Sequence, residues 1–172
     1  MKKIILSGYM GSGKSTVARL LHAKTGMKAL DLDDFIEKSE GMAIPEIFAT
    51  KGEIHFRKLE HETLRKLLNS GEAFILSLGG GTPCYANNHE LLKREDVITI
   101  YLKASPETLF ERLHAEAGNR PLLNDKSLEE MKEFIAVHLF ERSFYYNQSD
   151  YKVSTDGKSP DAIASEIEKI LA

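Results

Sequence analysis

The residues best suited to chemistry lie near the beginning of the sequence, where Gly8–Ser15 reads Gly-Tyr-Met-Gly-Ser-Gly-Lys-Ser. This stretch fits G-x-x-x-x-G-K-[ST], the pattern of a phosphate-binding P-loop. Its glycines let successive backbone N–H groups turn inward around a phosphate. Lys14 is expected to reach the β and γ phosphates, and the Ser15 hydroxyl to bind Mg²⁺. The motif therefore predicts a purine nucleoside triphosphate with Mg²⁺. The expected nucleotide-binding residues here are Gly11, Ser12, Gly13, Lys14, Ser15 and Thr16.

The segments on either side of this motif predict the elements that position it. Lys3–Ser7 is a short apolar run typical of a strand, and Val17, Leu20 and Leu21 recur at helical spacing. We expect the helix to run from about Lys14 to Thr25, so that its first turn adds a partial positive charge beside the phosphates. The alternative is a glycine-rich turn, capped by Ser15, with an exposed Lys14.

Two acids follow the next apolar segment. Residues 29–34 read as a second strand, in which Asp31 and Asp33 project from one face toward the carboxyl edge of the sheet. A carboxylate there can hold a Mg²⁺-bound water or accept a hydroxyl proton. The alternative for both is a solvated strand end. For Asp34 we favour an N-cap of the following helix.

A glycine triplet suggests a second part of the site. Gly79, Gly80 and Gly81 directly follow residues 73–78, which are apolar on both faces like a central parallel strand. Three glycines there weaken the fold unless the backbone must approach another group closely.

Four basic residues are candidates for contacts with phosphate or substrate. Arg112 and Arg120 bracket a polar stretch that could act as a lid and bring an arginine to a transferring phosphoryl group. The alternative is a plain surface loop. Arg57, near the start of a leucine-lined helix, and Arg142 are unremarkable when taken alone.

The remaining reactive side chains do not predict a metal or redox centre. The six histidines never pair in a zinc-binding pattern with one another or with Cys84, so we expect no protein-bound zinc. Cys84 is the single cysteine, which argues against a disulfide framework and suits a reducing cytosol. Tyr145 and Tyr146 are expected to be packing residues.

Composition limits the class of protein. The chain has 172 residues, of which 28% are charged and 42% hydrophobic, as in one ordinary globular domain spanning 1–172. A net charge of −3 argues against nucleic acid or an anionic membrane as a partner. We find no secretory signal and no apolar run near the roughly 18 residues of a membrane span. We therefore expect a cytoplasmic protein, and a monomer because no long exposed apolar face is evident.

Further periodic segments complete the fold prediction. They alternate strands with helices, which indicates a parallel sheet of five strands with right-handed crossovers. The further helices are expected at 45–50 and 53–69, from 105 onward, from the capping box Ser127-Leu-Glu-Glu130 to about 148, and after Ser159-Pro160-Asp161; the further strands are expected at 97–102 and 151–154.

Taken together, the motifs resemble those of the shikimate kinase family over essentially the whole chain. The resemblance implies a three-layer α/β/α P-loop NTPase fold like that of nucleoside monophosphate kinases, with a substrate-binding helical region at about 33–62 and a lid at about 112–125. The motifs that carry it are Gly8–Thr16, Asp31-Leu-Asp33, Ile47–Thr50 with Gly52-Glu53 and Phe56-Arg57, Leu78–Gly81, Arg120-Pro121-Leu122-Leu123, and Glu141-Arg142 followed by Tyr146.

The resemblance also implies a reaction, the ATP-dependent phosphorylation of the 3-hydroxyl of shikimate, with Asp33, Lys14 and Arg120 as catalytic residues. Asp31 would help to place Mg²⁺ beside Ser15, and Lys158 falls where the family contacts adenine. Arg57 and Arg142 could clamp the shikimate carboxylate in bidentate fashion. The implied shikimate-binding residues are Asp33, Arg57, Gly79, Gly80, Gly81 and Arg142, and the implied ATP contacts outside the P-loop are Arg112, Arg120 and Lys158.

The chain differs from the family's usual pattern at two places. One is Lys158, which stands at a position that varies in the family. The other lies before the lid. An arginine usually stands seven residues before the lid Arg-Pro, whereas here Leu113 occupies that position and Arg112 lies eight before.

Two rival functions are considered. One is a related kinase for gluconate or a nucleoside monophosphate, which would lack this combination of Asp33, Phe56-Arg57 and the glycine triplet. The other is a nucleotide switch, which would need a base-reading N-K-x-D motif; Asn124-Asp-Lys-Ser does not fit it.

Overall fold

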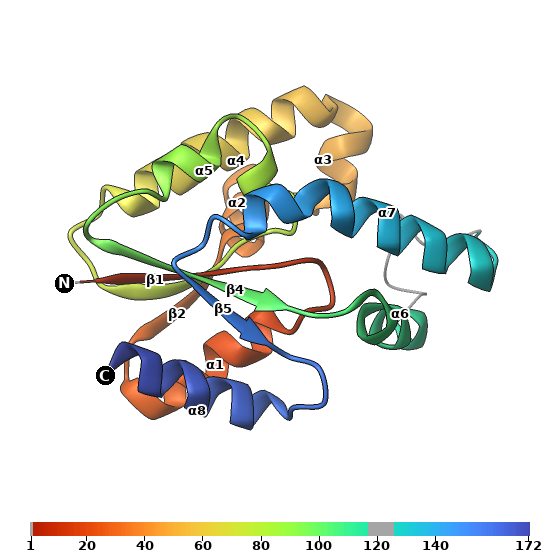
Figure 1. Ribbon diagram of the computed structural model, residues 1–172. Coiled ribbons are helices and arrows are strands. Elements are labelled where there is room, and N and C mark those ends of the chain that lie inside the picture. The colour runs from red at the N-terminus through yellow and green to blue at the C-terminus, as the bar shows by residue number, and fades with distance from the viewer. Residues whose placement is uncertain (1, 117–125) are drawn as a thin grey trace.

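A five-stranded parallel sheet, in the order β2-β3-β1-β4-β5, forms the centre of the molecule (Figure 1). The computed structural model describes residues 2–116 and 126–172. The chain starts at the middle of the sheet, fills one side, and then crosses β1 to fill the other. The connections that leave β1 and β3 therefore run in opposite directions, which opens a crevice at the carboxyl ends of these strands. The strands are β1 (Lys3–Ser7), β2 (Lys28–Asp31), β3 (Phe74–Ser77), β4 (Val97–Lys103) and β5 (Tyr151–Ser154).

Helices cover both faces of the sheet, as the sequence predicted (Figure 1). On one face lie α1 (Lys14–Thr25) and α8 (Pro160–Leu171). On the other face the core includes residues of α2 (Leu32–Glu40), α3 (Ile44–Lys51), α4 (Glu53–Leu68) and α5 (Asn88–Leu91). Near the carboxyl ends of the strands, α6 (Pro106–Ala115) packs against α7 (Leu128–Tyr146). Ser127 and Glu130 form the predicted capping box of α7.

The alternation along β1 divides the core between the two faces. Ile4 and Leu6 pack with α1 and α8, whereas Ile5 packs with the helices of the opposite face. Successive side chains of a strand point to opposite faces, so a strand covered on both sides must be apolar at every position. This explains why β1 and β3 read as continuous apolar runs.

The predicted second strand was too long. β2 ends at Asp31, and α2 begins at Leu32. The Asp31 side chain accepts hydrogen bonds from the backbone N–H groups of Asp33 and Asp34, so Asp31 is the N-cap and Asp34 is not. These bonds give partners to the N–H groups of Asp33 and Asp34. If the strand continued at this edge of the sheet, those groups would lack the capping bonds. The short α5 and the 3₁₀ helix η1 (Thr82–Cys84) were not predicted.

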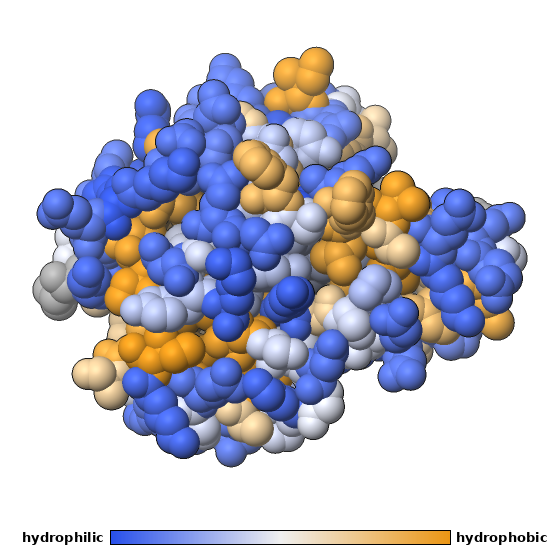
Figure 2. All heavy atoms as spheres, viewed as in Figure 1, coloured by the Kyte–Doolittle hydropathy of each residue, from blue (hydrophilic) through white to orange (hydrophobic). Residues whose placement is uncertain are grey.

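On the face shown in Figure 2 hydrophilic residues are in the majority, and one group of hydrophobic residues lies over α7. Val137, Phe140 and Phe144 are 51%, 80% and 67% exposed. The expectation that no apolar face would be exposed was therefore wrong for this helix, although its consequence, a monomer, stays a prediction. Among the described residues, none of the helices has the length and apolar character needed to cross a bilayer.

Candidate active site

The P-loop joins the carboxyl end of β1 to the start of α1 and has the geometry of a phosphate cradle. Gly8, Gly11 and Gly13 have φ angles of 149°, 82° and 96°, which residues with a Cβ rarely adopt. Gly13 is the N-cap of α1 and provides no side-chain cap, so the first N–H groups of the helix face the loop. The loop borders a cleft of about 470 Å³, lined by residues 10–17, Asp31, Asp33, Leu78, Gly79, Gly80, Arg112, Glu116, Pro160 and Ile163.

The lysine of the P-loop is held by the loop itself. The buried Lys14 Nζ donates to the carbonyl oxygens of Gly8 and Tyr9, at 2.7 and 3.1 Å. Its positive charge is therefore held at the start of the loop, on the border of the cleft.

A carboxylate and a hydroxyl meet at the predicted metal position. The Ser15 hydroxyl donates to Asp31 Oδ2 at 2.9 Å, while Asp31 Oδ1 caps α2. Both oxygens are hard ligands of the kind that Mg²⁺ prefers, directly or through water. The pair therefore fits a magnesium ion beside the P-loop.

Asp33 lies in the first turn of α2, with its side chain directed into the cleft. The sequence-based expectation that it shares a strand face with Asp31 was wrong, yet both acids border the same cleft. Burial, followed by the nearby charges of Asp31 and Glu60, raises the pKa of Asp33 from 3.8 to about 6, although Lys14 opposes this shift. A carboxylate of this kind is a stronger base than an ordinary aspartate.

The glycine triplet is the point where the acid and two arginines converge. A Cβ at Gly79 would lie 3.1 Å from Asp33 Oδ1, and one at Gly81 would lie 2.9 Å from Arg57 Nη2. A Cβ at Gly80 would lie 3.1 Å from Arg142 Nη1. None of the three glycines has a positive φ. They are therefore required for close approach and not for backbone conformation.

Arg57 and Arg142 reach this point from α4 and α7. Arg57 Nη1 donates to Glu60 Oε1 at 2.9 Å, and Thr82 Oγ1 donates to the other carboxylate oxygen of Glu60 at 2.9 Å. Glu60 is 1% exposed. Sequence reasoning missed it, although its i+3 spacing from Arg57 on a helix is a recognisable ion-pair signal.

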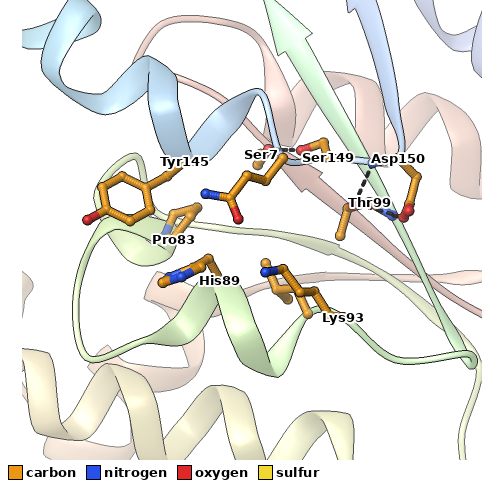
Figure 3. Close-up of a pocket in the computed structure, with 10 residues that line it drawn as sticks. Ser7, Pro83, His89, Lys93, Thr99, Tyr145, Ser149 and Asp150 are labelled. Carbon is orange, nitrogen blue, oxygen red and sulfur yellow. Dashed lines mark hydrogen bonds between the residues drawn. The ribbon is translucent and has the colours of Figure 1, made fainter.

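The carboxyl end of α7 is fixed by contacts with the sheet and with the glycine triplet. The buried Tyr146 donates from its hydroxyl to the Gly80 carbonyl oxygen at 2.5 Å, a more specific role than the expected packing. Beyond the helix, Asp150 Oδ2 accepts from Thr99 N and Oγ1, both at 2.8 Å, beside a small cavity of about 40 Å³ (Figure 3). These bonds hold α7 so that Arg142 faces the glycine triplet.

Arg112 reaches the P-loop in spite of the shifted spacing. Its Nη1 donates to the carbonyl oxygens of Gly11 and Ser12, both at 3.2 Å. Leu113, in the position where the family has arginine, is fully buried, with its Cδ2 2.9 Å from a Cβ built on Gly11. Arg112 is thus the residue of this pair that borders the cleft.

Of the two other predicted ATP contacts, the structure describes Lys158 only. Lys158 Nζ forms an ion pair with Glu166 of α8 at 2.7 Å, and Lys158 does not line the cleft. Arg120 and most of the predicted lid lie outside the described residues, because the structure describes residues 112–116 of that segment and resumes at 126.

Comparison with known proteins identifies the family. A family model described as shikimate kinase matches residues 10–172. The shikimate kinase of Flavobacterium johnsoniae is 55% identical over 172 residues, with all of both chains covered. The crystal structure of shikimate kinase from Bacteroides thetaiotaomicron superimposes with a TM-score of 0.90 at 31% identity, covering 99% of this chain and 98% of that one. Shikimate kinase from Acinetobacter baumannii, solved in complex with shikimate, gives a TM-score of 0.86 at 33% identity and covers 99% of this chain and 93% of that one. This chain belongs to the shikimate kinase family.

Proposed function

We propose that this protein transfers the γ-phosphoryl group of ATP to the 3-hydroxyl of shikimate, giving 3-phosphoshikimate and ADP in aromatic amino acid biosynthesis. The observation that carries this proposal is the convergence of Asp33, Arg57 and Arg142 on the glycine triplet beside the P-loop. An acid and two guanidinium groups match an acceptor that has hydroxyl groups at one end and a carboxylate at the other.

The nucleotide is assigned to the P-loop side of the cleft. The loop amides from Gly11 to Thr16 and the Lys14 ammonium group would bind the phosphates, and Arg112 stands at the edge of the loop. Ser15 and Asp31 would hold Mg²⁺, which when bound offsets negative charge on the phosphate oxygens. Arg120 at the phosphates and Lys158 at the adenine remain predictions.

The acceptor is assigned to the glycine-triplet side. Arg57 and Arg142 would bind the carboxylate through paired N–H groups, and a planar fork matches a carboxylate better than an ammonium group does. Asp33 would orient the 3-hydroxyl and take its proton as the oxygen attacks the γ-phosphorus. Most of the rate enhancement then comes from positioning and from fixed positive charge.

The wider predictions accompany this function. We expect one domain over residues 1–172, with 33–62 binding shikimate and 112–125 acting as a lid. We also expect a cytoplasmic monomer whose partner is a small molecule, not nucleic acid or a membrane.

A coupled ADP-release assay tests the proposal against its rivals. The purified protein is given MgATP with shikimate, gluconate, AMP or no acceptor. Rapid ADP release with shikimate alone is expected. Release that is equal with all four additions would indicate a nucleotide hydrolase or switch, and release with gluconate or AMP would reassign the acceptor.

A further inference from the structure

The guanidinium group of Arg57 is enclosed by several neighbours. Glu53 Oε1 lies 3.7 Å from Nε, and the centroid of the Phe56 ring lies 5.1 Å from Cζ. Three other neighbours complete the enclosure. The Arg57 Cζ lies 3.8 Å from the centroid of the Tyr85 ring, so that the ring covers one face of the cation. One edge is used by Glu60, which accepts from Nη1 at 2.9 Å. Gly81 is so close that a Cβ there would lie 2.9 Å from Nη2. Such an enclosure restricts a long side chain that would otherwise sample many rotamers.

Tyr85 does not have the burial of a core residue. It is 37% exposed, in the segment that joins η1 to α5. Aromatic rings over guanidinium groups are attractive contacts, and the attraction strengthens when the pair is partly removed from water. The position of this ring is therefore explained by its contact with Arg57.

The backbone after Tyr85 is held in an uncommon conformation. Ala86 and Asn87 have φ angles of 51° and 54°, in the left-handed region that residues other than glycine seldom enter. Consecutive residues persist there when surrounding contacts determine the conformation.

Asn88 supplies those surrounding contacts. Its side chain is fully buried, and Nδ2 donates to the Thr82 carbonyl oxygen at 2.9 Å. Its Oδ1 is hydrogen-bonded to His61 Nδ1 of α4 at 2.7 Å, and its backbone N–H donates to the Tyr85 carbonyl oxygen at 3.0 Å. The segment that carries Tyr85 is thus fastened to α4, the same helix that carries Arg57.

We propose that Tyr85 is a positioning residue for the acceptor, because its ring holds the Arg57 guanidinium group in the plane from which it binds a carboxylate. The inference rests on the proposed function and adds to it a residue outside the family motifs described above. An arginine fixed before binding loses less conformational entropy when the carboxylate arrives, so the effect belongs to acceptor affinity.

Steady-state kinetics of Tyr85→Leu and its matched control Tyr85→Phe test the inference. The leucine removes the aromatic face and keeps apolar bulk, whereas the phenylalanine keeps the face and loses the hydroxyl. We expect Tyr85→Leu to raise the KM for shikimate about fivefold or more, with the KM for ATP and the melting temperature little changed. Tyr85→Phe is expected to stay within about twofold of the wild type.

A second non-aromatic variant, Tyr85→Val, suits the extended backbone at this position (φ −124°, ψ 156°) and replaces the leucine variant if that one folds poorly. An unchanged KM for shikimate in the non-aromatic variant would overturn the inference, as would equal losses in Tyr85→Phe. A parallel rise in both KM values with a lower melting temperature would show a structural role and would also overturn it. A wild-type protein inactive on shikimate would refute the proposed function itself, whereas an active wild type beside an unimpaired Tyr85→Leu refutes this inference alone.

Discussion

At the scale of single residues, Asp33 is the group whose chemistry the fold alters most clearly. It lines the cleft near the charges of Asp31 and Glu60, and burial is the main reason that its pKa rises to about 6. Asp33→Asn keeps the shape of the side chain but removes the base. We expect kcat to fall by about 10² to 10⁴-fold while MgATP still binds, as measured by turnover and by nucleotide titration. Full activity in this variant would remove Asp33 from the mechanism.

The same raised pKa has a consequence for stability. Between pH 3.8 and about 6 the folded protein keeps a proton on Asp33 that the unfolded chain releases. Stability associated with this group is therefore fully present below pH 3.8 and is lost as the pH rises through about 6. Asp33→Asn has no carboxyl group to ionise at this position and therefore avoids this loss of stability.

We expect Asp33→Asn to be more stable than the wild type by roughly 1–3 kcal/mol at pH 7.5, and this advantage to vanish near pH 4. Urea unfolding of both proteins across this pH range measures the difference. A variant that is less stable than the wild type at pH 7.5 would contradict the assignment of a buried, ionised carboxylate.

At the scale of elements, the glycine triplet after β3 leaves room for the side chains of Arg57 and Arg142 to approach the backbone closely. Gly81→Ala is compatible with the backbone, whose φ is −91°, but the new methyl group would lie 2.9 Å from Arg57 Nη2. We expect the KM for shikimate to rise about tenfold as the arginine is displaced, with little change for ATP. Gly71→Ala is the matched control, because no atom lies within 4 Å of a Cβ there. Equal kinetics in the two variants would show that the triplet is not packed against the arginines.

Local sequence signals predicted most elements, because capping and periodicity act over a few residues. The capping box of α7 and the apolar strands β1 and β3 are examples. The boundary between β2 and α2 was misplaced, because an acid at the end of a strand can be either a surface residue or a helix cap. Asp31 is a cap because its carboxylate meets the Ser15 hydroxyl and the first N–H groups of α2.

The site was harder to predict from local patterns than the fold. Arg57, Gly81 and Arg142 are far apart in sequence and acquire meaning when the sheet brings them together. Their roles came from a family resemblance. Tyr85 lies in a segment without periodicity, so its contact with Arg57 left no sequence signal.

At the scale of the whole molecule, both halves of the site stand at one edge of one sheet. The P-loop follows β1, the glycine triplet follows β3, and these strands are neighbours in parallel register. Tyr9 of the P-loop also hydrogen-bonds to His138 Nδ1 of α7 at 3.0 Å, which ties the loop to the helix that carries Arg142. Under the proposed function, the framework would present two adjacent subsites, with Lys14 among the cations of the nucleotide subsite and Arg57 among those of the acceptor subsite.

This arrangement predicts that a substitution can abolish the binding of MgATP without abolishing the binding of shikimate, and the reverse. A ligand that binds the folded state at about 100 times its Kd stabilises that state by about 2.7 kcal/mol, which corresponds to a rise of roughly 5–10 °C in Tm for a domain of this size. Lys14→Met should lose the rise caused by a non-hydrolysable MgATP analogue and keep the rise caused by shikimate. Arg57→Ala should show the reverse. Thermal melts of both variants with each ligand provide the comparison. If Arg57→Ala kept the full rise in Tm with shikimate, the arginine would not be part of the acceptor subsite. The proposed acceptor contacts come from α2, α4, α7 and the turn after β3, and not from Lys14. Loss of both rises in Lys14→Met would therefore show that the two subsites are not separate.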